Sequence, residues 1–199
     1  MYAKNFRRYA WNALRGSWAM MILITLIYSA LITISASILG VGPLIITGPL
    51  TVGLYGVTLS LLRRKQTPVE GLFDGFTSGF ADNFLAYLLV SVFTFLWSLL
   101  FIIPGIVKGL SYSMTFFILK DHPGMSAMDA ITASRRMMQG HKWRLFCLQF
   151  SFIGWYILCA LTGGILTLWV TPYVYTATAV FYESIKGGTL TDGDTVEEA

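Results

Sequence analysis

Few side chains in this sequence combine a reactive group with the spacing that catalysis or metal binding requires. His122 and His141 stand far apart, without the HxxxH spacing or the clustered carboxylates of a metal site. The sequence contains no nucleophile motif, no phosphate-binding glycine loop and no pair of carboxylates within an apolar run. Asp82 and Glu183 fall at the ends of apolar runs, where solvated helix termini explain them. We therefore expect no catalytic residue, no metal site and no cofactor, and a protein that is not an enzyme.

Lys108 is the basic residue that lies within the apolar part of the chain. Ionisable groups at membrane depth are candidates for function by default. Two interpretations stay open. In the first, the flexible stem of Lys108 carries its ammonium group to the membrane surface. In the second, Lys108 lines a polar path. Seven hydroxyl side chains could share this path: Ser111, Tyr112, Ser113, Thr115, Thr162, Thr167 and Thr171. The same hydroxyls could equally form hydrogen bonds between helices.

The other basic residues gather at the borders of the apolar runs. Of the 14 Lys and Arg residues, only Lys108 lies away from these borders. Each such charge contributes about 1 kcal/mol near an anionic leaflet, although orientation by the positive-inside rule alone also accounts for them. For this reason the net charge of +4 does not indicate nucleic-acid binding. The candidates for contact with anionic lipid headgroups or an acidic partner are Arg7, Arg8, Arg63, Arg64, Lys65, Arg135, Arg136, Lys142 and Arg144.

Long apolar runs are the elements that must position these residues. Hydrophobic residues make up 55% of the chain and charged residues only 12%, against about 25% charged residues in soluble domains. Several runs reach the roughly 20 residues that a helix needs to cross a bilayer. We predict an all-α membrane protein with one membrane domain over residues 1–185 and a disordered acidic tail over 186–199. Its six spans are expected at about 18–39, 44–62, 83–103, 105–119, 145–168 and 170–185.

The distribution of charge predicts the orientation of the chain. With six spans, four segments that carry the basic residues share one side: 1–17, 63–82, 120–144 and 186–199. The positive-inside rule then places both chain ends in the cytoplasm. A cleaved signal peptide is the alternative for the first span, because small residues occur at 35–37, but its apolar core exceeds the 7–15 residues typical of such peptides. We expect the span to be retained.

A unit of about sixty residues recurs three times along the chain. Each unit contains a short amphipathic cytoplasmic helix, a glycine break and a hairpin of two spans. The breaks fall at Gly16, Gly79 and Gly140. In the second unit Gly71, Gly75 and Gly79 recur at every fourth residue, which fits either a helix at the membrane interface or a glycine face that docks against another helix.

Proline and glycine predict where the hairpins turn. Pro104 and Gly105 are expected to form the turn of the second hairpin, because proline blocks helix continuation and glycine accepts a sharp reversal. Gly105 and Gly109 form a small-xxx-small pair that predicts close packing within this hairpin. Pro172 marks the expected turn of the third hairpin. Whether the short span 105–119 crosses the bilayer fully stays open.

The chain resembles bacterial integral membrane proteins grouped as domain of unknown function 975. The resemblance rests on short stretches in the same order, which together cover most of residues 5–185: 72–76, 103–108, 111–114, 134–142, 151–155, 172–173 and 181–182. It implies a membrane protein with several spans and no established activity, and it carries over no catalytic residue.

Two functions fit these features. The first is a non-enzymatic accessory or lipid-associated factor of the bacterial plasma membrane, with anionic membrane lipids and a membrane or cytoplasmic protein as partners. Short uncharged outer loops and three cytoplasmic amphipathic segments favour it. The alternative is a small transporter or channel for an unidentified solute.

Overall fold

The computed structural model describes residues 3–37, 42–63 and 69–187. All regular structure in these ranges is helical, as predicted from the apolar runs, and no strand occurs in them. Residues 188–199, which hold most of the predicted acidic tail, lie outside the described residues.

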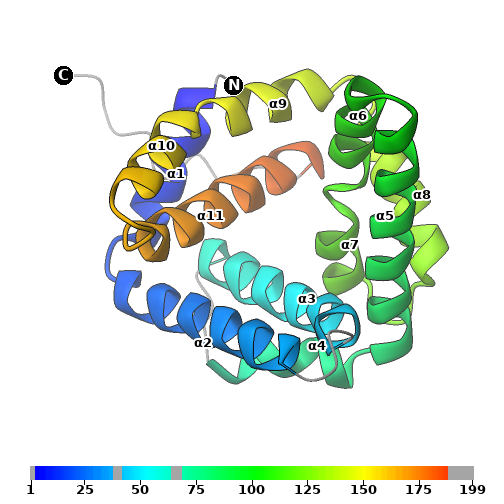
Figure 1. Cartoon of the computed structure of the whole chain (residues 1–199), viewed down its shortest axis with the longest axis horizontal. Coiled ribbons are helices and arrows are strands. Elements are labelled where there is room, and N and C mark those ends of the chain that lie inside the picture. The colour runs from blue at the N-terminus through cyan, green and yellow to red at the C-terminus, as the bar shows by residue number, and fades with distance from the viewer. Residues whose placement is uncertain (1–2, 38–41, 64–68, 188–199) are drawn as a thin grey trace.

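Three helical hairpins form the body of the molecule (Figure 1). The first consists of α2 (Trp18–Ala36) and α3 (Gly42–Leu62). The second consists of α5 (Phe80–Leu100) and a return limb that is divided into α6 (Ile102–Tyr112) and α7 (Thr115–Asp121). The third pairs α9 (Lys142–Phe150) and α10 (Ile153–Leu161) with α11 (Thr167–Ile185).

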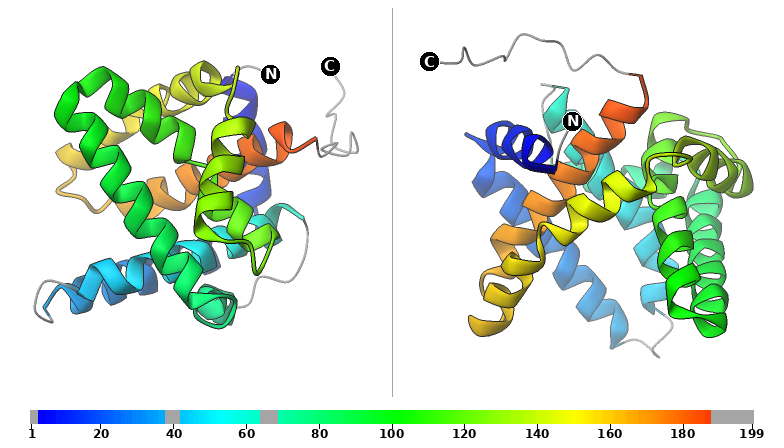
Figure 2. Two further views of the ribbon diagram at one scale, coloured as in Figure 1. Left: turned by 90° about the vertical axis from the view of Figure 1, so that its right-hand side faces the viewer. Right: turned by 90° about the horizontal axis from the view of Figure 1, so that it is seen from above.

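The second limbs of the three hairpins lie inside the first limbs. Figure 1 shows α3, α7 and α11, here called the inner helices, within a ring formed by α2, α5, α9 and α10. The ends of the hairpins point to one side of the molecule and separate from one another, while the C-terminal ends of the inner helices converge on the other side (Figure 2). We call these the hairpin side and the base.

A short helical segment precedes each hairpin: α1 (Ala3–Leu14), η1 (Val69–Phe73) with α4 (Asp74–Thr77), and α8 (Ala127–Met137). The apolar face of α1 packs on α11, where the Phe6 ring meets Phe181 at 5.5 Å, so this face covers protein instead of the headgroup layer. The glycine face of the second segment docks on α3, since a Cβ at Gly75 would overlap the Pro49 carbonyl. The Ser126 hydroxyl accepts a hydrogen bond from the backbone N–H of Asp129 and so caps α8.

The three glycine breaks have the same conformation. Gly16, Gly79 and Gly140 have φ values of 89°, 82° and 78°, and each lies just before the first limb of a hairpin. Because side chains with a Cβ rarely adopt positive φ, glycine is needed at the same point of every unit. This agreement supports the predicted threefold repeat.

The turn of the second hairpin lies three residues before its predicted place. Phe101 is extended, with φ −159° and ψ 145°, and it separates α5 from α6. Pro104 lies in the first turn of α6, where a helix leaves its N–H groups unpaired in any case. Gly105 contacts the other limb, because a Cβ there would overlap Ser98, whereas a Cβ at Gly109 would make an ordinary 3.7 Å contact with Thr94. The predicted close packing therefore depends on Gly105.

The third hairpin also differs from its prediction. The expected span 145–168 is divided at Ser151–Phe152 and ends at Leu161, and the chain turns at Gly163 and Gly164, which both have positive φ. Pro172 lies inside α11. The prediction of a turn at Pro172 was wrong because Gly163 and Gly164 already supply the turn, and a proline inside a membrane helix is tolerated where other groups pair the carbonyl that it frees.

Four helical segments among the described residues are long and apolar enough to cross a membrane: Trp18–Ala36, Gly42–Leu62, Phe80–Leu99 and Lys142–Leu161. Large apolar side chains are exposed on them towards the hairpin side, including Phe95, Leu99 and Leu161, at 68%, 75% and 78%. Exposed apolar surface of this extent marks contact with a membrane or partner. These findings support a membrane protein, whereas the predicted spans 105–119 and 170–185 stay predictions.

Candidate functional site

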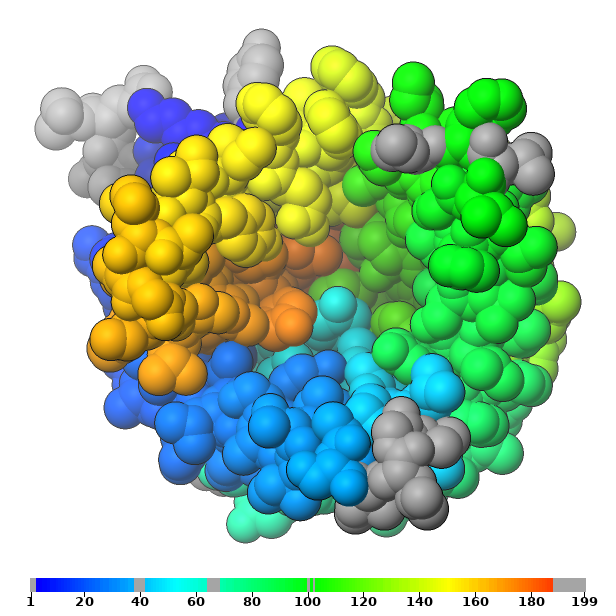
Figure 3. Space-filling view, in the orientation of Figure 1, coloured from blue at the N-terminus to red at the C-terminus, as the bar shows by residue number. Residues whose placement is uncertain are grey.

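A cavity of about 340 Å³ lies between the inner helices. The space-filling view shows it as a hollow among α3, α11 and the second hairpin, open towards the hairpin side (Figure 3). Volumes of this order are typical of sites for small molecules. The cavity is lined by Tyr55, Val90, Thr94, Gly109, Tyr112, Ser113, Phe116, Gln149, Tyr156, Val174, Tyr175 and Thr178.

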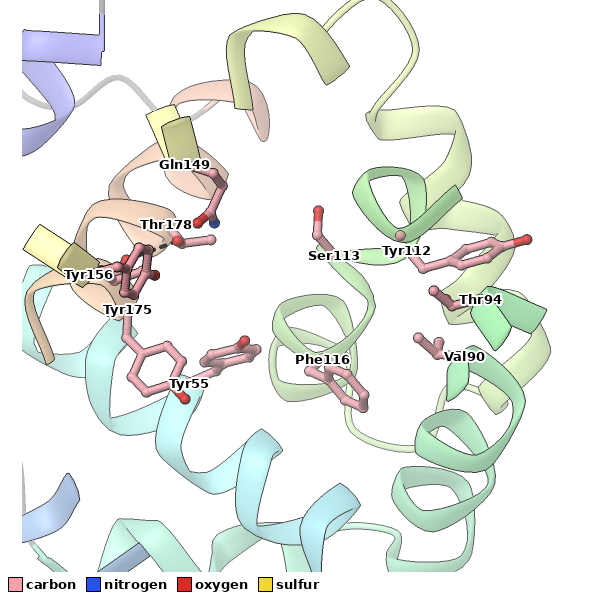
Figure 4. Close-up of a pocket in the computed structure, with 12 residues that line it drawn as sticks. Tyr55, Val90, Thr94, Tyr112, Ser113, Phe116, Gln149, Tyr156, Tyr175 and Thr178 are labelled. Atoms are coloured by element: carbon pink, nitrogen blue, oxygen red, sulfur yellow. Dashed lines mark hydrogen bonds between the residues drawn. The ribbon is translucent and has the colours of Figure 1, made fainter. Parts of the chain in front are cut away.

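The lining combines hydroxyl and amide groups with apolar and aromatic surface, and it carries no formal charge. Figure 4 shows Gln149, Tyr156, Tyr175 and Thr178 on one side of the cavity, and Ser113 opposite them. The ring of Tyr112 points away from these residues. A charged ligand would lose its hydration here without gaining a counter-charge, so the lining favours an uncharged molecule.

Several polar groups of the lining lack a partner. Within the described residues, the hydroxyls of Tyr55, Tyr156 and Tyr175 and the amide of Gln149 make no hydrogen bond to protein. The Thr178 hydroxyl donates to the Val174 carbonyl, which leaves its oxygen free to accept. Polar groups withdrawn from water are costly unless they are paired. The cavity therefore offers donors and acceptors to a bound molecule or to water.

Three stacked aromatic rings lie below the cavity, one from each inner helix. The ring centroids of Tyr55 and Phe117 are 4.2 Å apart with planes inclined by 5°, and those of Phe117 and Tyr182 are 5.0 Å apart. Phe117 and Tyr182 are fully buried. Because Tyr55 also lines the cavity, this aromatic stack separates the cavity from the base.

An ion cluster joins the C-terminal ends of the inner helices at the base. Arg63, after α3, donates two hydrogen bonds of 2.9 Å to Asp121, the last residue of α7. Its Nη2 also contacts Glu183 Oε1 of α11 at 2.6 Å. Lys186, which follows α11, donates to Asp121 Oδ2 at 2.5 Å, and the Tyr182 hydroxyl donates to the same oxygen at 2.9 Å. The cluster therefore connects all three hairpins.

The partners of Asp121 keep it ionised. Burial alone would raise the pKa of Asp121, but hydrogen bonds from Arg63, Lys186 and Tyr182 outweigh burial and lower the pKa to about 2. The pKa of Arg63 is raised, chiefly by its hydrogen bonds to Asp121. Asp121 and Arg63 are therefore both charged at neutral pH.

The predicted polar path agrees with this cavity only in part. Ser113 and Tyr112 line the cavity, whereas Ser111 is buried and donates to the Val107 carbonyl. Lys108 lies outside the lining, with its ammonium 4.5 Å from the centre of the Trp97 ring. The other four predicted hydroxyls, Thr115, Thr162, Thr167 and Thr171, do not line the cavity.

The predicted basic contact residues separate into two groups. Arg7 donates to the Ser151 carbonyl at 3.0 Å, Arg144 lies over the rings of Phe6 and Phe181, and Arg63 belongs to the ion cluster. These three stabilise the fold. The side chains of Arg8, Arg135 and Arg136 are exposed and that of Lys142 is half-buried, while Arg64 and Lys65 lie outside the described residues.

Sequence reasoning missed most of the site. Glu183 was expected at a solvated helix end, but its side chain is only 14% exposed and accepts from Arg63. Tyr55 and Tyr175 resemble ordinary tyrosines of apolar runs, and nothing in their spacing distinguishes them. Gln149 is the residue from which the sequence could have indicated the site, because an amide within a predicted span requires a hydrogen-bond partner. Among the described residues, no three His, Cys, Asp or Glu side chains lie together in a way that could hold a metal ion.

Comparison with known proteins gives one match. Residues 102–189 match a family model described as "Protein of unknown function (DUF975)". This segment includes the cavity residues from Gly109 to Thr178 and the ion-cluster residues Asp121, Glu183 and Lys186, but not Tyr55 or Arg63. No curated protein and no solved structure matches the chain.

Proposed function

The chain belongs to this family of proteins of unknown function, and from that premise we propose that it is a membrane carrier for a small, uncharged, polar solute. The observation that carries the proposal is the cavity, in which the hydroxyls of Tyr55, Tyr156 and Tyr175 and the amide of Gln149 have no protein partner within the described residues. The cavity lies between hairpins that contain membrane-length apolar helices. Hydrogen-bonding groups in that position can replace the water that a polar molecule loses when it enters the membrane.

The substrate class follows from the chemistry of the lining. Tyrosine hydroxyls and the Gln149 amide can both donate and accept hydrogen bonds, and aromatic faces border the same space. A polyol or a monosaccharide presents hydroxyls and apolar C–H faces to such groups. An ion of either sign would lack a counter-charge in the lining.

The orientation proposed for the carrier is the one predicted from charge. Six spans in three hairpins place the base, with exposed Arg135 and Arg136 on α8, in the cytoplasm of a bacterial plasma membrane. In that orientation the cavity of this structure opens towards the outside. α11 is 19 residues long and the α6–α7 limb is broken, so these two limbs would cross as the inner wall of the cavity.

The accessory or lipid-associated role is the second candidate. The exposed side chains of Arg8, Arg135 and Arg136 favour it, because they are free to meet anionic headgroups or an acidic protein. It requires no use of the cavity, which is why transport is the better explanation of the unpaired lining groups.

Uptake by proteoliposomes tests the carrier. Purified protein would be reconstituted and the entry of labelled glycerol, xylitol and glucose compared with entry into protein-free vesicles, with gluconate as the charged control. We expect faster entry of at least one uncharged solute and no acceleration of gluconate. Equal rates with and without protein for all three uncharged solutes would rule out the proposed substrate class, and acceleration of gluconate would show that charge is not excluded.

A further inference from the structure

We propose that Asp121, held by Arg63, Lys186 and Tyr182, is the positioning residue of an inner gate, and that its release opens the cavity towards the base. The inference rests on the proposed function, because a gate has meaning only for a cavity that is used from both sides. It concerns residues that do not line the cavity and that would not touch the solute.

The first support is the place of the cluster in the repeat. Arg63, Asp121 and Glu183 lie at the C-terminal ends of α3, α7 and α11, which are the second limbs of the three hairpins. The hairpins separate towards the hairpin side (Figure 2). At the other end, this cluster joins their inner helices. Breaking the cluster would free the three inner helices at the point where they close the cavity.

The second support is a continuous line of contacts from the cavity to the cluster. Tyr55 lines the cavity and stacks on Phe117, which stacks on Tyr182. The Tyr182 hydroxyl donates to Asp121. Asp121 therefore orients the lowest ring of the aromatic stack, and its release would remove the hydrogen bond that holds Tyr182 across the base.

The third support is the composition of the cluster. Side chains of Arg63 and Lys186 are 34% and 35% exposed, so water can replace their contacts to Asp121. Water can solvate the charges of Arg63 and Lys186 when these ion pairs separate, which lowers the cost of opening, whereas separating a close-packed apolar contact exposes apolar surface to water. A partly hydrated cluster is therefore suited to repeated opening and closing.

The fourth support is a break in the limb that carries Asp121. Ser113 and Met114 separate α6 from α7, at the level of the cavity. Ser134 of α8 satisfies the interrupted backbone, because its hydroxyl donates to the Ser111 carbonyl at 2.8 Å and accepts from the Met114 N–H at 3.2 Å. A side chain from another helix thus replaces the helix's own hydrogen bonds, and α7 can tilt about this point without leaving polar groups unpaired.

Accessibility of a single cysteine from each side of the membrane tests the gate without requiring any solute. Cys147 and Cys159 are the free cysteines of the described chain, and the reporter would be Ser113→Cys in a Cys147→Ser, Cys159→Ala background. Intact spheroplasts and inverted vesicles would be treated with a membrane-impermeant maleimide. Arg136→Cys, exposed on α8, calibrates which side is the base.

We expect Ser113→Cys to react from the hairpin side and to be protected from the base. Asp121→Asn should increase the rate of labelling from the base at least tenfold, and Asp121→Glu should restore protection. Asp74→Asn is the matched control, because it breaks the ion pair of the neighbouring Lys120 outside the cluster and should leave labelling unchanged. Arg63→Gln removes one of the three partners of Asp121 and should act like Asp121→Asn.

The gate would be overturned by labelling from the base before any change in the cluster, or by unchanged protection in both cluster variants when each elutes as a folded protein. Failure of the proposed transport would give a different result. Solutes would then enter the proteoliposomes no faster than protein-free vesicles, while the labelling would still change as expected. An effect of Asp74→Asn equal to that of Asp121→Asn would indicate general loosening of α7 and would also overturn the proposal.

Discussion

The Tyr182 hydroxyl donates a 2.9 Å hydrogen bond to the Asp121 carboxylate, so one residue belongs to both the aromatic stack and the ion cluster. Its ring stacks on Phe117 and its oxygen reaches the charges at the base. A substitution can separate the contribution of the ring from that of the hydroxyl.

Tyr182→Phe removes only the hydroxyl and keeps the ring stacked on Phe117. A hydrogen bond to a charged group contributes about 1.5–3 kcal/mol, and since Arg63 and Lys186 remain on Asp121, we expect a loss near the lower value in the free energy of unfolding. Thermal unfolding in mild detergent measures it. Tyr9→Phe is the control, because the Tyr9 hydroxyl has no partner within the described residues. An equal loss in both variants would contradict the assigned role.

Acid should weaken the cluster within a defined range of pH. The pKa of Asp121 is lowered from 3.8 to about 2, so folding favours the ionised form. Its contribution is complete above about pH 4 and is lost as the pH falls through about 2. At pH 7 we expect Asp121→Asn to be less stable by about 2 kcal/mol. The difference from wild type should shrink between pH 4 and pH 2, and a difference that does not change with pH would contradict the shifted pKa.

Tyr175→Phe should have opposite effects on uptake and stability. Its hydroxyl lines the cavity without a protein partner, so the folded protein loses nothing by its removal. A bound solute would lose a hydrogen bond of about 1 kcal/mol, which corresponds to a roughly fivefold lower kcat/KM for uptake. Stability should be unchanged or slightly higher. Tyr87→Phe, a tyrosine of α5 outside the lining, should leave uptake unchanged.

Thr178→Val tests the same wall of the cavity with a closely matched control. The hydroxyls of Thr178 and Thr33 both donate to the carbonyl four residues earlier, but only Thr178 lines the cavity. We expect Thr178→Val to lower uptake severalfold and Thr33→Val to have no effect on it. If both variants lower uptake equally, the effect comes from the helices and not from the cavity.

Gly105→Ala and Gly109→Ala should change stability in opposite directions. A Cβ at residue 105 would overlap Ser98, and overpacking of this kind costs about 1–3 kcal/mol. A Cβ at residue 109 has space beside Thr94, and alanine is favoured over glycine within a helix by about 1 kcal/mol. Thermal unfolding of the two variants in the same detergent compares them directly. Equal behaviour would contradict the close approach of α5 and α6.

The apolar runs and the glycines predicted the helical class and the glycine breaks, because these depend on local composition and backbone preference. The turns at Phe101 and at Gly163–Gly164 were missed because proline was given more weight than its place in a helix allows. The cavity was missed for a different reason. Its tyrosines are chemically the same as those of a membrane boundary, and only the arrangement of three hairpins distinguishes them.

The ion cluster was beyond sequence reasoning because its members are far apart in the chain. Arg63 is separated from Asp121 by 58 residues and from Glu183 by 120. Each charge alone has a sufficient explanation at the end of an apolar run. Their pairing requires the inner helices to end at the same level, which spacing along one chain does not reveal.

The repeat places a charge at the same point of each unit, but the signs differ: Arg63 in the first, Asp121 in the second, Glu183 and Lys186 in the third. An assembly of three identical hairpins would bring three like charges together on its symmetry axis, where they would repel one another. Joining three unequal units in a single chain allows attraction at that axis. The departure from symmetry is thus what permits the three hairpins to close.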